Sequence, residues 1–407
     1  MATSYKKIRI AFIKFGGLAV GGSEMWLQKM AANLPRDLFD VDYFYSDIAP
    51  LFGTDYKHTD TDIHRLKYME DHKVNLIKFH ITAVDYRFHY HPWIGTDFWQ
   101  IFNPKKYDII QTIKAGPKEY PFYLINLPIV EIVALANRPD KSNNIAWSFH
   151  SSPWQRNVWL KKGGSEKRSS VLPAPLDRQL TTENYRGELV IPQNAIVAGF
   201  HQRADNNIWS PIPLNAFSQL QKSQKNFDWH FFIKGGGDKY REQAKELGLK
   251  NAHFLPADGD NIGTSKFLNT LDIFAHGRGD GETFGAVFVE AMIHSKPCLS
   301  HHSQTGLDAQ KETMGNAGLF AVDEDDYTKK LNALFFDKNL RETLAKEAVK
   351  NSSTYSIENT VKNAMSVYEE VLRDPTRFKI KINKLTKTRD FIYSYAIFII
   401  KYVKHYF

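Results

Sequence analysis

Residues 282–292 read Glu282-Thr283-Phe284-Gly285-Ala286-Val287-Phe288-Val289-Glu290-Ala291-Met292, and this stretch indicates fold and function more clearly than any other part of the chain. A short apolar segment at 271–275, typical of a strand, precedes it. Gly277, Gly279 and Gly281 then predict a turn, and the apolar periodic residues that follow predict a helix. A glycine turn between a strand and a helix exposes backbone N–H groups at the positive helix end, which favours an anion.

The two glutamates of this stretch are separated by a step of eight residues. On one continuous helix that step would turn their side chains about 80° apart. We therefore expect Glu282 in the loop and Glu290 on the first helical turns, about 9 Å further along. This separation suits a ligand with hydroxyl groups at both ends and phosphates in the middle, such as a nucleotide sugar.

Several other segments occur in an order that is found in a known family. They are Ile8–Phe12 with Gly21–Glu24, Gly199–Arg203, Phe232–Gly237, and Lys296-Pro297 after the stretch itself. In these residues the chain resembles the retaining glycosyltransferases with a Glu-x7-Glu motif, family four of the GT-B superfamily. The resemblance reaches to about residue 372. It implies an α/β fold of the GT-B type, in which two Rossmann-like, doubly wound domains face each other across a cleft.

The resemblance also implies roles for individual residues. Glu290 would accept hydrogen bonds from the ribose hydroxyls, and Glu282 would bind hydroxyls of the transferred sugar. Backbone N–H groups around Phe284 and Gly285 would hold the sugar and the distal phosphate, and Arg203 would neutralise the pyrophosphate. Negative charge grows on the phosphate as the sugar–phosphate bond breaks, and these fixed groups would lower the barrier. We therefore expect no metal ion and no cofactor.

The chain departs from the family pattern at two positions. Ile208 lies where a lysine usually follows the arginine, so Lys234 and Arg278 are candidates to replace that cation. Gln111 lies where the first domain often carries a histidine, and His150, at the end of a predicted strand, is a candidate catalytic residue; a structural or surface histidine is the alternative. The candidate catalytic residues are Glu282, Arg203 and His150, and the candidate donor-binding residues are Gly21, Gly22, Arg203, Lys234, Arg278, Glu282, Thr283, Phe284, Gly285 and Glu290.

Simpler interpretations stay open for some of these residues. Gly21-Gly22 fits a turn before a helix that is capped by Ser23, and Lys234 fits the beginning of a loop. His301-His302 and Asp258-Gly259-Asp260 resemble parts of metal sites. No further ligand spacing supports a metal at His301-His302. Asp258-Gly259-Asp260 lies between a predicted strand and a predicted helix of the second domain, which speaks against a metal there.

Strands alternate with helical patterns along the chain, which predicts βαβ units and parallel sheets. We place an acceptor-binding domain at 1–187 and a donor-binding domain at 188–372, with the polar stretch 178–188 as the linker. The predicted strands lie at 41–45, 75–79, 107–111, 145–149 and 172–177 in the first half, and at 195–200, 229–234, 252–255, 273–276 and 298–300 in the second.

Residues 373–407 form a basic, aromatic tail. It has nine Lys and Arg against two Asp, a net +7 of the chain's total of +8. A nearly neutral body with one basic strip does not fit a nucleic-acid-binding protein. The apolar run at 391–400 is too short to span a bilayer. We interpret the tail as an anchor on an anionic membrane surface; the alternative is the terminal helix that crosses back onto the first domain, which we place near 361–372.

The composition agrees with a cytoplasmic enzyme. The single cysteine, Cys298, excludes a disulfide framework and fits a reducing compartment. The first residues contain no signal-peptide core, and no apolar run is long enough to cross a bilayer. We expect a cytoplasmic protein, with the tail bringing it to the inner face of the cytoplasmic membrane.

We interpret the chain as a retaining, metal-independent hexosyltransferase of surface polysaccharide biosynthesis. It would move a sugar from a nucleoside-diphosphate sugar to a glycan or lipid-linked acceptor, without nucleic acid as a partner. Three alternatives stay open: a GT-B isomerase (epimerase), a non-catalytic nucleotide-sugar binding protein, and a phosphorylase with a pyridoxal-binding lysine.

Overall fold

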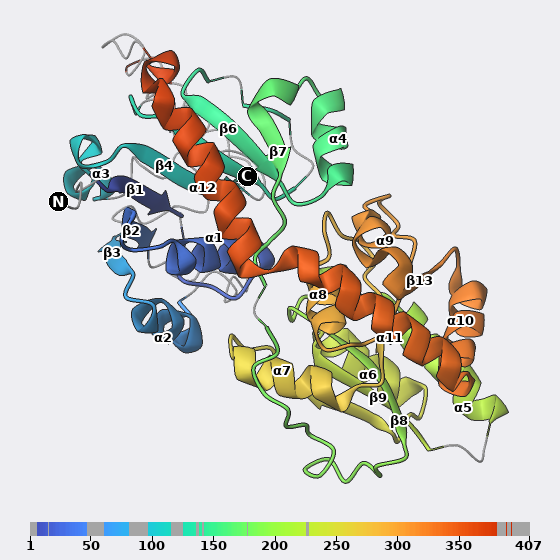
Figure 1. Ribbon diagram of the computed structural model, residues 1–407. Coiled ribbons are helices and arrows are strands. Elements are labelled where there is room, and N and C mark those ends of the chain that lie inside the picture. The colour runs from blue at the N-terminus through green and yellow to red at the C-terminus, as the bar shows by residue number, and fades with distance from the viewer. Residues whose placement is uncertain are drawn as a thin grey trace. The chain divides into compact units, whose positions relative to one another are not determined.

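The computed structural model consists of two compact units, each built around one parallel sheet (Figure 1). Unit 1 comprises Met1–Pro173 and Thr360–Phe407, and unit 2 comprises Ala174–Asn359. The structure describes residues 6–14, 16–46, 61–80, 97–114, 125–135, 138–140, 142–176, 178–224, 228–380, 388 and 392. The chain therefore passes between the units at 173–174 and 359–360, earlier than the boundaries after 187 and 372 that the sequence predicts.

The sheet of unit 1 has seven strands in the order β3-β2-β1-β4-β5-β6-β7, and neighbouring strands pair in parallel. Helices follow β1, β2, β3 and β6, in agreement with the predicted α/β alternation. The strands are β1 (Ile8–Ile13), β2 (Phe39–Ser46), β3 (Asn75–Phe79), β4 (Ile109–Lys114), β5 (Ile129–Val133), β6 (Ile145–His150) and β7 (Ser169–Val171). The α-helices are α1 (Gly22–Asn33), α2 (Ile63–Asp71), α3 (Phe98–Ile101) and α4 (Pro153–Lys161), and the 3-10 turns are η3 (Pro104–Lys106) and η5 (Glu166–Arg168).

Strand β5 is not predicted from the sequence, although all five of its residues are buried. Its central residue, Glu131, interrupts the apolar pattern. The Glu131 carboxylate is nevertheless buried, because Lys114 Nζ lies 2.7 Å from Oε2 and the Ser148 hydroxyl donates to Oε1 at 2.8 Å. A carboxylate with such partners costs far less to bury than an isolated one, so a charged residue inside an apolar run does not exclude a central strand.

The strand predicted at 172–177 is wrong for the residues that the structure describes there. Strand β7 ends at Val171, and Leu176 makes only a single parallel bridge, to Ser356. The physical reason is the composition of this segment: Pro173 and Pro175 have no N–H group and cannot donate to a sheet ladder.

Helix α12 (Ile357–Arg373) begins in unit 2, and its residues from Thr360 onward belong to unit 1. Tyr368 is fully buried, and its hydroxyl donates to Gln111 Oε1 at 2.7 Å. The same ring lies 6.1 Å from the ring of Phe39, centroid to centroid. The position of α12 confirms the crossover helix predicted near 361–372, and it gives Gln111 a structural partner.

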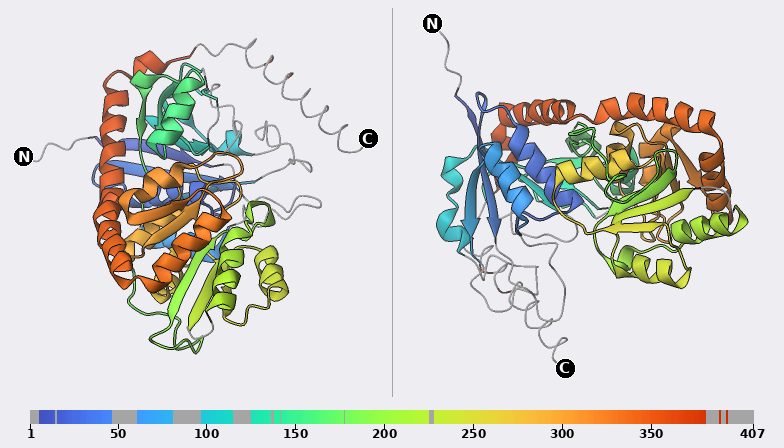
Figure 2. Two further views of the ribbon diagram at one scale, coloured as in Figure 1. Left: turned by 90° about the vertical axis from the view of Figure 1, so that its right-hand side faces the viewer. Right: turned by 90° about the horizontal axis from the view of Figure 1, so that it is seen from below.

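The sheet of unit 2 has six strands in the order β10-β9-β8-β11-β12-β13, again paired in parallel. Figure 2 shows helices on both faces of this sheet, as in a doubly wound fold. The strands are β8 (Ile196–Gln202), β9 (Trp229–Gly235), β10 (Ala252–Leu255), β11 (Ile273–Ala275), β12 (Cys298–His301) and β13 (Gly318–Ala321). The α-helices are α5 (Ile212–Ser223), α6 (Asp238–Glu246), α7 (Asn261–Thr270), α8 (Ala286–Ile293), α9 (Ala309–Met314), α10 (Glu324–Phe336) and α11 (Lys338–Ser352), and the 3-10 turns are η6 (Asn206–Ile208), η7 (Gly315–Ala317) and η8 (Ser353–Tyr355).

The polar stretch 178–188, predicted as the linker, is hydrogen-bonded to unit 2. The backbone N–H of Leu180 donates to Ser265 Oγ at 3.1 Å, and that of Tyr185 donates to Thr270 Oγ1 at 2.9 Å. Both hydroxyl groups are on α7. These bonds fix the stretch against unit 2 and explain why the chain enters that unit before residue 187.

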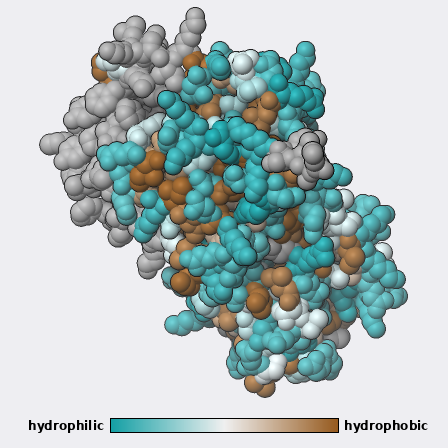
Figure 3. Space-filling view, turned by 60° about the vertical axis from the view of Figure 1, so that its left-hand side comes forward, coloured by the Kyte–Doolittle hydropathy of each residue, from teal (hydrophilic) through white to brown (hydrophobic). Residues whose placement is uncertain are grey.

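The surface in Figure 3 is mainly hydrophilic, with small groups of hydrophobic residues among the polar ones. In the part of the chain that the structure describes, no helix combines the length and apolar character needed to cross a membrane. The tail is described through Ile380 and includes the 3-10 turn η9 (Pro375–Phe378). The apolar run predicted at 391–400 lies outside the described residues, apart from Ile392.

Candidate functional site

The carboxyl ends of the strands of unit 2 carry most of the predicted site residues. Strand β8 lies between β9 and β11, so the strand order reverses beside β8: β9 and β10 extend to one side, and β11, β12 and β13 to the other. Ligands of open parallel sheets bind outside the carboxyl ends of the strands at such a switch point. Here the point lies between Gln202, which ends β8, and Ala275, which ends β11.

The two glutamates of the opening stretch lie as predicted. Glu282 is in the loop after β11, and Glu290 is inside α8, which begins at Ala286. Gly285 precedes the helix with φ 84° and ψ 57°, a left-handed conformation that side chains other than glycine rarely adopt. A Cβ at this position would lie 2.8 Å from Phe288 Cδ2. Glycine is therefore required at the beginning of α8.

The residues between the glutamates hold the beginning of α8 in place. Phe284 is buried, and its carbonyl accepts a hydrogen bond from Thr313 Oγ1 at 2.5 Å. Its ring lies 5.6 Å from the ring of Tyr355, centroid to centroid. Thr283 is half-buried. The N-terminal amides of the helix are thus held by packing on one side, which favours a fixed anion site.

The backbone of the β11–α8 loop is paired with the loop that follows β12. The Glu282 N–H donates to the Leu307 carbonyl at 2.7 Å, and the Glu282 carbonyl accepts from the Ala309 N–H at 3.1 Å. The Thr305 hydroxyl donates to the Asp280 carbonyl at 2.6 Å. The main chain at Glu282 is consequently fixed at both its N–H and its carbonyl.

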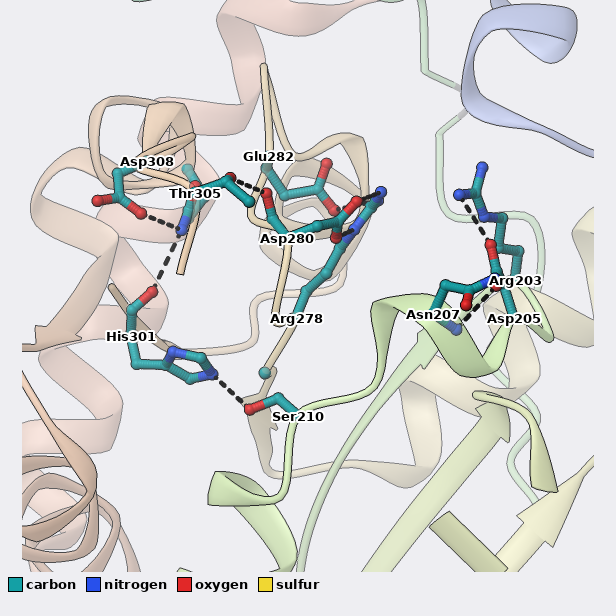
Figure 4. Close-up of polar contacts among 12 residues, drawn as sticks. Arg203, Asp205, Asn207, Ser210, Arg278, Asp280, Glu282, His301, Thr305 and Asp308 are labelled. Carbon is teal, nitrogen blue, oxygen red and sulfur yellow. Dashed lines mark hydrogen bonds and ion pairs between the residues drawn. The ribbon is translucent and has the colours of Figure 1, made fainter. Parts of the chain in front are cut away.

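Arg278 lies between two carboxylates (Figure 4). Its Nε and Nη2 atoms donate to the two oxygens of Asp280, at 2.5 and 2.9 Å, and Nη1 donates to Glu282 Oε1 at 3.1 Å. Burial alone would lower the pKa of Arg278, but the charge of Glu282 and the pairing with Asp280 raise it above its usual value. The sequence suggests that Arg278 replaces the missing lysine as a positive partner of the pyrophosphate. In the structure, its charge is instead neutralised by two acids.

Arg203 directly follows β8, and Lys234 is the last residue but one of β9. Each of them has an acidic partner. Arg203 Nη2 lies 3.0 Å from Asp205 Oδ2, with 44% of its side chain exposed. Lys234 Nζ donates to Asp258 Oδ1 at 2.6 Å, with 5% of its side chain exposed. Burial would raise the pKa of Asp205, but the Asn207 N–H and Arg203 lower it. Arg203 is therefore the more accessible of these two cations.

The position where the family carries a lysine is part of the core. Ile208 is 2% exposed, and its carbonyl accepts from the Gly279 N–H at 3.1 Å. Ile208 therefore supplies no positive charge where the family carries a lysine.

The predicted glycine turn after β9 is present. Gly235, Gly236 and Gly237 have φ values of 80°, 81° and 81°. A Cβ at Gly235 would lie 1.9 Å from the Gln202 carbonyl oxygen, and the Gly236 N–H donates to that oxygen at 3.2 Å. The turn therefore brings β9 and β8 close together at the switch point and leads directly into α6.

His201 is a site residue that the sequence analysis does not identify. Its Nε2 atom lies 3.1 Å from Glu290 Oε2, and its ring packs against Phe267 and Phe274. The alternation of side chains along a strand could have identified it. His201 is next to Phe200 in β8, so the two side chains point to opposite faces of the sheet. The contact orients the carboxylate that is predicted to bind the ribose.

The two motifs that resemble metal sites have other partners. Asp258 pairs with the lysine described above, and Asp260 accepts a hydrogen bond from a backbone N–H of α7 at 2.9 Å. His301 Nδ1 donates to the His302 carbonyl at 2.6 Å, and His302 Nδ1 lies 2.7 Å from Asp308 Oδ2. Within the described ranges, no three His, Cys, Asp or Glu side chains are grouped so that they could hold a metal ion.

The candidate glycines of unit 1 lie at the beginning of α1. Gly21 is the N-cap residue, and a Cβ there would lie 2.3 Å from Glu24 Oε2. Ser23 does not cap the helix; its hydroxyl donates to Glu24 Oε2 at 2.7 Å, and Lys14 Nζ lies 3.5 Å from Glu24 Oε1. Burial would raise the pKa of Glu24, but Lys14 and Ser23 hold it below its usual value. Gly22 has open space around it.

His150 ends β6 and has no exposed surface. Its Nδ1 atom lies 2.8 Å from Gln155 Oε1, and its ring centroid lies 4.6 Å from that of Trp159. Burial lowers the pKa of His150 to about 4. The ring is therefore neutral at neutral pH and inaccessible to a ligand in this conformation, which favours the structural alternative over a catalytic role.

Comparison with known proteins shows which family and which solved structures the chain resembles. Residues 182–351 match the family described as Glycosyl transferases group 1. Over 202 residues the chain is 28% identical to a D-inositol 3-phosphate glycosyltransferase from Corynebacterium urealyticum; the match covers 47% of this chain and 46% of that relative. The chain thus matches about half the length of this curated relative.

Solved structures resemble the chain over most of its length. One is HepE from Anabaena in complex with UDP and glucose, with a TM-score of 0.68, 17% identity and coverage of 89% of this chain and 100% of that one. Another is WaaG, described as a glycosyltransferase involved in lipopolysaccharide biosynthesis, with a TM-score of 0.64, 14% identity and coverage of 88% and 99%. These similarities establish the GT-B fold.

Proposed function

Residues 182–351 belong to the glycosyl transferases group 1 family, and from this premise we propose that the protein transfers a sugar from a nucleoside-diphosphate sugar to a hydroxyl group of a glycan or lipid-linked glycan. In this reaction the bond between the anomeric carbon and the diphosphate breaks, and a bond from that carbon to the acceptor oxygen forms. The diphosphate leaves with the electron pair, and the acceptor hydroxyl loses its proton. We further propose retention of the anomeric configuration, on the family resemblance.

One observation carries the proposal: Glu282 lies in the loop just before the N-terminus of α8, and Glu290 lies inside α8. Both are beside the switch point of the sheet. In this arrangement Glu290 accepts hydrogen bonds from the ribose, and Glu282 accepts them from the transferred sugar. The phosphates lie between, where the amides at the beginning of α8 and the exposed Arg203 offset their charge. These groups supply charge stabilisation without a metal, so we propose that the reaction is metal-independent.

Similar proteins support a nucleotide sugar as the donor. HepE from Anabaena is described in complex with UDP and glucose, and its fold covers 89% of this chain. The relative with 28% identity is described as a glycosyltransferase. We propose a donor of the same chemical class, with a surface glycan as the acceptor.

The basic tail supports attachment to an anionic membrane surface. Near the described end of the tail, Lys6, Lys7 and Lys379 line a hollow of about 400 Å³ together with Leu372 and Phe378. The lining also includes Asp108 and Asn126, so the hollow is only partly apolar. Three lysines beside such a hollow suit an interface of acidic headgroups and hydrocarbon. We propose that the enzyme acts as a peripheral protein on the inner face of the cytoplasmic membrane.

The proposed function is tested by a panel of nucleotide sugars. Binding is measured as the rise in melting temperature, because a ligand of the folded state stabilises it by mass action. The donor that binds is then incubated with candidate acceptors in EDTA, and the anomer of the product is determined by NMR. Epimer formation from the donor alone would identify an isomerase instead, binding without turnover would identify a binding protein, and a bound pyridoxal chromophore would identify a phosphorylase.

A further inference from the structure

The ion-pair cluster of Arg278, Asp280 and Glu282 is not explained by the proposed roles. Three N–H groups of the guanidinium donate to the two carboxylates. The cluster contains two acids and one base, so it carries a net charge of about −1. A group with that net charge is a poor partner for a pyrophosphate, although Arg278 is the residue that sequence spacing suggests for it.

The contacts of the cluster restrict the side chain of Glu282. The main chain of this residue is already held by the loop at 307–309 on both its N–H and its carbonyl. Arg278 Nη1 adds a bond to Glu282 Oε1 at 3.1 Å, which restricts the remaining side-chain rotation. Oε2, the second carboxylate oxygen, takes no part in this bond.

Asp280 fixes the arginine itself. It binds Nε and Nη2 as a fork, at 2.5 and 2.9 Å, so that the guanidinium plane has one orientation. The Asp280 backbone is in turn held by the Thr305 hydroxyl. The side chains of Arg278 and Glu282 are 21% and 16% exposed, so water screens this pair less than it screens a surface pair.

We propose that Arg278 is a positioning residue for Glu282: it holds one carboxylate oxygen so that the other meets the hydroxyls of the transferred sugar. Asp280 keeps Arg278 in the orientation that does so. This inference rests on the proposed function, because it takes Glu282 as the group that binds the sugar. It assigns Arg278 to the sugar end of the donor and not to the pyrophosphate.

The test measures separately how much the sugar and the nucleoside diphosphate contribute to donor affinity. Calorimetry measures the affinity of wild type and Arg278→Gln for UDP, GDP and ADP and for the matching glucose-containing nucleotide sugars. We expect the variant to bind the preferred nucleoside diphosphate within about twofold of wild type, and to lose the difference in affinity between that diphosphate and its nucleotide sugar. Turnover should fall about 10- to 100-fold, as expected when a reacting group is displaced by a fraction of an ångström to one ångström.

A double-variant cycle shows whether Arg278 acts through Glu282. In a Glu282→Gln background, the further change Arg278→Gln should alter turnover by less than about twofold, because the group that Arg278 positions is already lost. Asp280→Asn should give the same pattern as Arg278→Gln with a smaller loss. The matched control is Arg241→Gln: Arg241 is exposed on α6, with its guanidinium 4.8 Å from the Phe254 ring centroid, and its loss should leave binding and turnover unchanged.

The outcomes distinguish this inference from the proposed function. A loss of tenfold or more in nucleoside-diphosphate affinity in Arg278→Gln, or additive losses in the double variant, would overturn the positioning role and make Arg278 a phosphate ligand. If wild type binds no nucleotide sugar, the proposed function itself is refuted, and the positioning role with it. If Arg278→Gln melts far below wild type, Asp280→Asn decides, because it removes the charge that orients Arg278 while leaving Arg278 and Glu282 in place. Unchanged sugar-dependent affinity in a folded Asp280→Asn contradicts the proposal.

Discussion

Replacing His150 by asparagine separates a structural from a catalytic role. The buried ring has its pKa lowered to about 4 from an ordinary value of 6.5. An asparagine amide is able to donate to Gln155 Oε1 in place of Nδ1, which lies 2.8 Å away, but it does not titrate. The variant therefore keeps the main hydrogen bond and removes the protonation equilibrium.

The sign of the pH effect follows from proton binding. The unfolded ring takes up a proton below about pH 6.5, whereas the folded ring does so only near pH 4, so the unfolded state binds more protons between these values. The free energy of unfolding contributed by this residue is complete above pH 6.5 and is lost as the pH falls. Between about pH 7.5 and about pH 5 the loss is roughly 2 kcal/mol for His150 alone.

Urea unfolding followed by tryptophan fluorescence at these two pH values measures the effect. Other buried histidines with a lowered pKa, such as His253 and His294, contribute equally to both proteins. We expect His150→Asn to be less stable than wild type at the higher pH, but to lose about 2 kcal/mol less on acidification. It should also retain most of its turnover. An equal loss of stability in both proteins, or a turnover reduced about 100-fold in a folded variant, would refute the structural role.

Three further predictions concern the donor residues and the tail. Glu290→Ala should weaken donor binding by about 1–3 kcal/mol through lost hydrogen bonds to the ribose; unchanged affinity by calorimetry would contradict the assignment. Arg203→Ala should reduce turnover far more than the melting temperature, since its charge acts on the developing phosphate anion; a variant that turns over normally would exclude this role. Truncation after Ile380, which keeps the buried Phe378, should leave donor binding intact and strongly weaken salt-sensitive binding to anionic vesicles, because each removed Lys or Arg contributes about 1 kcal/mol; equal vesicle binding by the truncated protein would show that residues 381–407 are not part of the anchor.

The fold was largely predictable because its signals are local. Apolar runs such as 229–234 are followed by glycine turns, and both features depend on residues that are adjacent in the sequence. The same reasoning places Glu282 in a loop and Glu290 on a helix, as observed. Strand β5 was missed because the partners that make Glu131 buriable, Lys114 and Ser148, are distant in sequence.

The arrangement of side chains in the site was less predictable. Lys234 and Arg278 were expected to face a pyrophosphate, but each has an acidic partner that only the fold brings near, Asp258 for the first and Asp280 with Glu282 for the second. Asp280 and Glu282 are close in sequence to Arg278, yet the turn that directs them at one guanidinium is set by contacts with the next loop. Sequence spacing identifies which residues are near the site, whereas the pairing of charges requires the structure.

Transfer of a sugar from a nucleotide sugar is the central claim, and one measurement tests it most directly. The purified protein is incubated in EDTA with the nucleotide sugar that binds it best and a lipid-linked or soluble glycan acceptor, and the products are separated and examined by NMR. The account predicts an acceptor extended by one sugar with the anomeric configuration of the donor, and release of the nucleoside diphosphate in equal amount. No extended acceptor with any donor that binds, or transfer that appears only when magnesium is added, would contradict it.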